Sequence, residues 1–108
     1  MVLRLSKPID IYFASENAHD VAALEECLAA DAVVVDEHKT IRGLAAIKAW
    51  RTETGEKYAH SIEPIAVSED AGKVAVRCRV TGNFPGSPIE LDHIFSVRDG
   101  LITALEIR

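Results

Sequence analysis

A strict two-residue alternation in the second half of the chain is the feature that most limits what this sequence can fold into. Four apolar side chains occupy every second position of one segment: Val74, Val76, Cys78 and Val80. Successive side chains of a strand point to opposite faces of a sheet. Residues 73–84 are therefore predicted to form a strand with one face in a core and the other face open, as antiparallel sheets allow.

Similar strand signals lie on both sides of this segment. We expect strands over 58–68, 89–97 and 101–107, separated by turn-forming residues at 69–72, 85–88 and 98–100. Pro64 has no N–H to donate to a neighbouring strand, so the strand that contains it is predicted to lie at a sheet edge or to carry a bulge.

The first half of the chain follows helical spacing instead. Ser6 can cap a helix with Pro8 in its first turn, and one face of that helix follows the i, i+3, i+4, i+7 pattern through Ile9, Tyr12, Phe13 and Glu16. Two more helices are expected over 21–30 and 44–54, with a strand over 31–40 between them and Gly55 ending the last helix. Three helices followed by an antiparallel meander indicate an α+β fold, with the helices on one face of a bent sheet.

Composition narrows the class of protein. The 108 residues, 48% of them apolar, suit a single domain spanning 1–108. The net charge of −5 disfavours a nucleic-acid partner, which needs a basic face. No apolar stretch approaches the roughly 20 residues of a membrane span, and no secretory signal precedes the first helix, so we expect a cytoplasmic protein. Cys27 and Cys78 stand apart and are predicted to be reduced core residues.

Four segments resemble the nuclear transport factor 2-like superfamily: IYFASENAHDVAAL at 11–24, LAADAVVVD at 28–36, RGLAAIKAW at 42–50 and DHIFSVRDGLITALEI at 92–107. Within it, the chain looks most similar to the SnoaL-like polyketide cyclases and the ketosteroid isomerases. The resemblance implies a cone, in which a curved antiparallel sheet and three helices from the N-terminal half enclose an apolar pocket. It also implies a homodimer joined through the outer face of the sheet. The ligand would be a small apolar molecule.

The same resemblance assigns three catalytic residues. Asp36 would be the base, and Tyr12 and Asp92 would donate hydrogen bonds to the developing oxyanion. Moving a proton next to a carbonyl group needs a carboxylate that takes and returns the proton, together with donors where the enolate charge develops. We therefore predict that the three side chains open into one cavity, with the two donors on one side and Asp36 opposite them.

Less specific interpretations stay open for each of these residues. Asp36 could be a carboxylate at a strand end, and Tyr12 could be a core aromatic residue. Asp92 alternates with the apolar face of its strand, so it could point outward into a dimer contact. Arg77 and Arg79 could pair with acidic residues across that same outer face.

Six further residues are candidates for the pocket wall: Phe13, Val34, His38, Trp50, Tyr58 and Phe84. Trp50 is the largest member of its apolar stripe and is expected to be buried. The Asp36–His38 spacing, even with His60 and His93 available, fits no zinc pattern, so we expect no metal. We also expect no organic cofactor, since neither a dinucleotide-binding nor a phosphate-binding glycine motif is present.

Two functions follow as hypotheses. The first is a cofactor-independent enzyme of the SnoaL-like or ketosteroid isomerase-like type, an isomerase or cyclase that transfers protons on an apolar carbonyl substrate. The alternative is a non-catalytic ligand-binding or dimerisation module with the same fold. A pocket in which carboxylates converge would favour the first, and a pocket filled by aromatic side chains would favour the second.

Overall fold

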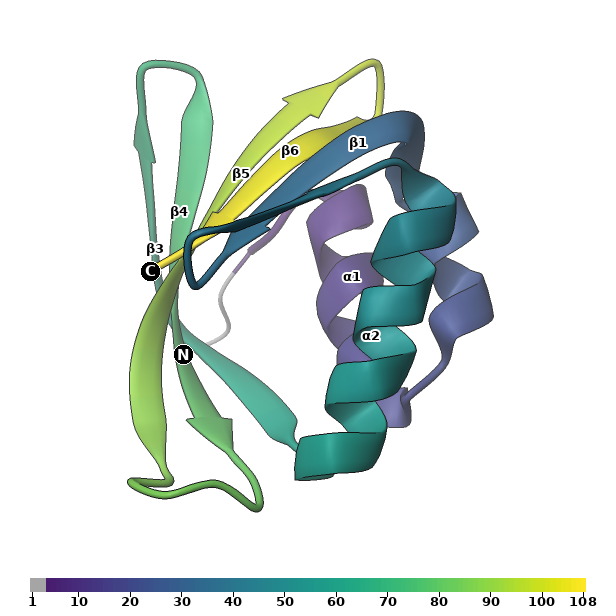
Figure 1. Cartoon of the computed structure of the whole chain (residues 1–108). Coiled ribbons are helices and arrows are strands. Elements are labelled where there is room, and N and C mark those ends of the chain that lie inside the picture. Colours follow the sequence, from purple (N-terminus) through teal and green to yellow (C-terminus); the bar gives the residue numbers. More distant parts are fainter. Residues whose placement is uncertain (1–3) are drawn as a thin grey trace.

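The computed structural model describes residues 4–108. In chain order its elements are α1 (Lys7–Ala18), the 3₁₀-helix η1 (Val21–Glu26), β1 (Leu28–Asp36), β2 (Lys39–Arg42), α2 (Leu44–Tyr58), β3 (Ser61–Asp70), β4 (Lys73–Thr81), β5 (Ile89–Arg98) and β6 (Leu101–Ile107). The six strands form one curved sheet, and α1 and α2 lie on its inner side, as Figure 1 shows. This is the predicted α+β architecture with three helices.

The sheet has the order β2-β1-β6-β5-β4-β3. All neighbouring strands are antiparallel except β1 and β6, which run parallel. This parallel pair joins the first strand of the chain to the last, so the helical half and the meander share one sheet. The alternation within β4 is confirmed, because Val76 and Cys78 are fully buried on the inner face while Arg77 is exposed on the outer face.

The first helix agrees with its sequence pattern. Pro8 lies in the first turn, where its missing N–H is not needed, and Ile9, Tyr12 and Phe13 pack into the core. The helix ends at His19, whose left-handed backbone (φ 54°) reverses the chain direction. Pro64 lies on the edge strand β3 next to a register shift, which confirms the edge position and the bulge.

Two boundaries in the first half differ from the prediction. The expected helix over 21–30 is only η1, because Leu28 already pairs with Ile102 of β6 and the backbone of Cys27 accepts a 2.7 Å hydrogen bond from Ile102. The expected strand over 31–40 is a hairpin, β1 and β2. Its turn lies at Glu37 and His38, both with positive φ. Sheet pairing supplied by distant residues therefore overrides the local helical pattern.

The second long helix is also longer than predicted. Gly55 lies inside α2, which continues to Tyr58 and ends at Ala59 in a left-handed conformation. A side chain at position 55 would approach the ring of His19 to 3.1 Å, so glycine permits close packing of α2 against the end of α1. The following strands shift accordingly: β3 begins at Ser61, and β4 ends at Thr81.

Candidate functional site

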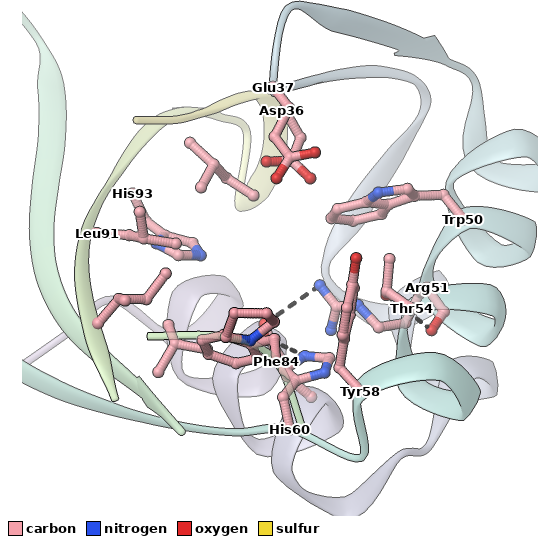
Figure 2. Close-up of a pocket in the computed structure, with 15 residues that line it drawn as sticks. Asp36, Glu37, Trp50, Arg51, Thr54, Tyr58, His60, Phe84, Leu91 and His93 are labelled. Atoms are coloured by element: carbon pink, nitrogen blue, oxygen red, sulfur yellow. Dashed lines mark hydrogen bonds and ion pairs between the residues drawn. The ribbon is translucent and has the colours of Figure 1, made fainter. Parts of the chain in front are cut away.

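A cavity of about 340 Å³ lies between α2 and the inner face of the sheet. Its volume is within the range of small-molecule sites. The residues that line it are Glu16, Asp36, Glu37, Trp50, Arg51, Thr54, Tyr58, His60, Val80, Phe84, Pro85, Ile89, Leu91, His93 and Ile107. Figure 2 shows Asp36 and Glu37 at one end of the cavity and His60 at the opposite end, with Trp50 and His93 on facing walls.

Asp36 reaches the cavity because it is the last residue of β1. It pairs with Ile107 of β6 and directly precedes the β1–β2 turn. Burial raises the pKa of this half-buried carboxyl group, and the neighbouring negative charge of Glu37 raises it further, while the Trp50 side chain acts in the opposite direction. The cavity thus contains a carboxyl group that holds a proton more readily than an ordinary aspartate.

A buried ionic cluster forms the opposite end, which we call the polar floor and define as Glu16, Arg51 and His60. The Glu16 carboxylate lies 3.2 Å from Arg51 Nη2 and 2.8 Å from His60 Nε2. Arg51 Nη2 also donates a hydrogen bond to the Tyr12 hydroxyl, and its guanidinium lies 4.7 Å from the centre of the Tyr12 ring. Glu16 and Arg51 are 5% and 3% exposed, so these contacts are shielded from solvent.

The cluster fixes the charges at the floor. Burial alone would raise the pKa of Glu16, but the hydrogen bond from His60 and the charge of Arg51 outweigh it and hold that pKa below its ordinary value. Burial also raises the pKa of Tyr12 far above its ordinary value, so its hydroxyl stays protonated. Arg51 is therefore balanced by one ionised carboxylate.

His93 contributes a second polar group, on the inner face of β5. It is 2% exposed and packs among aromatic rings, 5.6 Å from Phe13 and 6.5 Å from Tyr12 between ring centres. Burial lowers the pKa of its imidazole to about 4, and the positive charge of Arg51 acts in the same direction against the opposing effect of Glu16. At neutral pH the imidazole is uncharged.

The predicted position of Asp92 is wrong. Its side chain lies on the outer face of the sheet and makes a 3.1 Å ion pair with Arg77, which also bonds Glu90 at 3.1 Å. The reason is the strand period: His93 points inward, so Asp92 must point outward. The cross-strand charge pairs expected on this face are confirmed for Arg77.

Tyr12 also departs from the prediction that it opens into the cavity. It is fully buried, does not line the cavity, and its hydroxyl is engaged by Arg51. Only Asp36 of the three predicted catalytic residues faces the cavity, so the three side chains do not converge on one ligand. Whether Asp36 acts as a base stays a prediction.

The predicted wall residues divide into two groups. Trp50, Tyr58 and Phe84 line the cavity, whereas Phe13 and Val34 belong to the closed core and His38 lies exposed in the β1–β2 turn. Trp50 is half-buried rather than buried, because its cavity-facing side has no covering element.

Sequence reasoning assigned no site role to Glu16, Arg51 or His60. A usable signal was present: Glu16 is a charged residue on the apolar stripe of α1, and Arg51 follows Ile47 by four residues on the inner face of α2. A charge on a buried helical stripe needs a partner, so two such residues on adjacent helices predict a buried pair.

Across residues 4–108, no group of three or more His, Cys, Asp or Glu side chains is arranged to hold a metal ion. In the same residues, no helix is long and apolar enough to cross a membrane.

A known domain family and several solved structures match most of the chain. The SnoaL-like domain matches residues 9–105. A candidate polyketide cyclase from Sinorhizobium meliloti is 38% identical, with a TM-score of 0.92 over 96% of this chain and 95% of that one. No protein with a curated description matches the chain.

More distant structures share the fold. A protein with a ketosteroid isomerase-like fold from Catenulispora acidiphila, in complex with trimethylamine, is 18% identical, with a TM-score of 0.83 over 97% of this chain and 86% of that one. A candidate SnoaL-like polyketide cyclase from Jannaschia is 15% identical, with a TM-score of 0.74 over 99% and 90% of the two chains. The domain match covers most of the sequence and the first relative aligns over nearly its whole length, so this chain belongs to the SnoaL-like domain family and has its nuclear transport factor 2-like fold.

Proposed function

We propose that this protein is a cofactor-independent enzyme that transfers protons on a small, largely apolar carbonyl compound. The observation that carries this proposal is Asp36: a carboxyl group with a raised pKa at one end of a cavity whose walls are mostly apolar. A general base works best when its pKa lies near the working pH, and partial burial moves an aspartate in that direction.

The chemistry needs only one mobile proton. The Asp36 carboxylate removes a proton from the carbon next to the carbonyl group. The electrons of that C–H bond form a carbon–carbon double bond, and the π electrons of the carbonyl group move onto its oxygen. The same carboxyl group then returns the proton to the same carbon or to another one. Trp50, Phe84 and Leu91 provide an apolar surface for the rest of the carbonyl compound. The cavity extends past these side chains to the polar floor. The 38% identical candidate polyketide cyclase supports a carbonyl substrate.

Hydrogen–deuterium exchange tests this function without knowledge of the natural substrate. In D₂O, the wild-type protein is expected to accelerate exchange of the α-protons of 2-tetralone, followed by proton NMR against a protein-free control. Asp36→Asn should reduce the protein-dependent rate by about 100-fold or more, the range for loss of a general base. Asp31→Asn is the matched control, because Asp31 is an exposed aspartate on the same strand.

Two results would count against the proposal. Unchanged exchange by Asp36→Asn would remove Asp36 as the base. Saturable binding of 2-tetralone without any accelerated exchange would favour the alternative function, a non-catalytic ligand-binding module. In that alternative, the same cavity binds a ligand without chemistry.

A further inference from the structure

Two neighbouring carboxyl groups line the same end of the cavity, although strand alternation alone would point them to opposite faces. Asp36 is the last residue of β1, and Glu37 leaves the strand conformation with a positive φ of 50°. Both side chains therefore line the cavity, as Figure 2 shows. Glycine and asparagine adopt this backbone more readily than glutamate does, and such strained positions are concentrated at functional sites.

These two carboxylates have no cationic partner in the part of the chain that the structure describes. Of the described residues that line the cavity, only Arg51 and two histidines can carry a positive charge, and both Arg51 and His60 contact Glu16 instead. Lys39 pairs with Asp36 through the backbone of the β1–β2 hairpin, but it is exposed and does not line the cavity. Among residues 4–108, neither carboxylate forms an ion pair.

The electrostatics at this end of the cavity favour a positively charged ligand group. The negative charge of Glu37 raises the pKa of Asp36, so the two carboxylates repel each other, and a cation beside them would relieve that repulsion. The opposite wall adds no positive charge, because burial lowers the pKa of His93 to about 4 and leaves its imidazole neutral. The half-buried ring of Trp50 lies beside the carboxylates in Figure 2, and aromatic rings attract cations.

A buried polar atom without a partner provides a second indication that a molecule binds in this cavity. His93 is 2% exposed, and its Nδ1 atom has no hydrogen-bond partner among residues 4–108. In Figure 2 its ring points into the cavity from the wall that faces Trp50. Leaving a buried polar atom unpaired is unfavourable, so the cavity favours an occupant that carries a polar group.

We propose that Asp36 and Glu37 form a cation site for the protonated amino group of an otherwise largely apolar molecule, with Glu37 as the residue that determines the preference for positive charge. This inference deepens the proposed function and rests on it, because Asp36 would then act on a carbonyl compound that also carries an amine. Glu37 holds the ammonium group, and the neighbouring Asp36 carboxylate accepts the proton from carbon.

Three tetralin derivatives of one size separate the possible ligand charges: 2-aminotetralin, 2-tetralol and tetralin-2-carboxylate. An aliphatic amine is protonated at neutral pH, as a lysine side chain is. Isothermal titration calorimetry at neutral pH and low salt is expected to show 2-aminotetralin binding about 10-fold more tightly than the neutral alcohol, with the carboxylate weaker than both. Added salt should reduce this preference, because Glu37 is exposed and salt screens exposed charges.

A charge-removing variant locates the contact. Glu37→Gln should weaken binding of 2-aminotetralin about 5-fold or more and leave binding of 2-tetralol unchanged, because the amide keeps the shape of the side chain without its charge. Asp99→Asn is the matched control. Asp99 also has a positive φ, of 54°, in an exposed hairpin turn, and it does not line the cavity. This control removes the same charge and should bind all three probes as the wild-type protein does.

The outcomes separate this inference from the proposed function. Equal affinities for the amine and the alcohol, tighter binding of the carboxylate, or no saturable binding of the amine would each overturn the cation site. A preference for the amine that survives Glu37→Gln, or that Asp99→Asn reduces equally, would also overturn it.

The exchange of 2-tetralone tests the catalytic role independently of these affinities. Exchange catalysed by Asp36 with no preference for 2-aminotetralin would leave the proposed function standing and refute only the cation site. A preference for the amine that depends on Glu37, without any accelerated exchange, would support the cation site within a binding module and count against Asp36 as a base.

Discussion

Replacement of His93 should change how the stability of the protein depends on pH. The folded protein keeps this imidazole buried and uncharged, with a pKa of about 4 instead of 6.5. Below pH 6.5 the unfolded chain binds a proton that the folded protein excludes, so the free energy of unfolding falls as the pH falls, until about pH 4. One pKa unit corresponds to about 1.4 kcal/mol, so the full effect is ~3 kcal/mol.

Urea denaturation followed by far-UV circular dichroism measures this effect. The free energy of unfolding of the wild-type protein and of His93→Phe is determined at pH 7.0, 6.0, 5.0 and 4.5. The difference between the two proteins should shift in favour of the variant by ~1 kcal/mol per pH unit as the pH decreases. Asp36 and Glu16 titrate in both proteins, so their contributions cancel to first order in this difference. His38→Asn is the control, because His38 is exposed in a turn with positive φ that asparagine tolerates.

A constant difference between wild type and His93→Phe across this pH range would refute the reasoning. It would mean that the folded protein protonates His93 as easily as the unfolded chain does.

Three further predictions concern the remaining elements. Glu16→Gln should lower the free energy of unfolding by about 3 kcal/mol, because it leaves Arg51 buried without its counter-charge. Glu25→Gln is the control, since it breaks an exposed ion pair and should cost less than about 1 kcal/mol. Similar shifts of the two variants in thermal denaturation would contradict this prediction. Trp50→Ala should cost about 2 kcal/mol rather than the 3–5 typical of a buried aromatic residue, and an unchanged urea midpoint would argue against its packing role. We also predict a homodimer through the outer face of the sheet. Light scattering of the wild-type protein should give a mass of about twice 11.8 kDa, and Ile94→Glu should lower that mass to that of one chain. A wild-type monomer at micromolar concentration would exclude the dimer.

The elements predicted most accurately are those in which the local pattern and the global fold agree. The alternation through Val76 and Cys78 identified β4 and its buried face, and the spacing of Ile9 and Tyr12 identified α1. The pattern was misleading over residues 21–30. There the apolar stripe is typical of a helix, but Leu28 pairs in parallel with β6, and this contact joins residues far apart in the sequence. Local spacing cannot represent such a contact.

For the candidate site, the sequence alone placed Asp36 on the inward-facing side of its predicted strand, because the strand period determines that side; only the structure ends β1 at Asp36. The sequence could not decide between Asp92 and His93, since the same alternation allows either face of β5 to be the inner one. Packing against α1 and α2 settles this: the rings of Phe13 and Tyr12 meet His93. The ion pair of Glu16 with Arg51 likewise exists only in the tertiary structure. Burying either charge alone on the inner face of its helix would be unfavourable, and only their 3.2 Å contact inside the fold compensates for this cost.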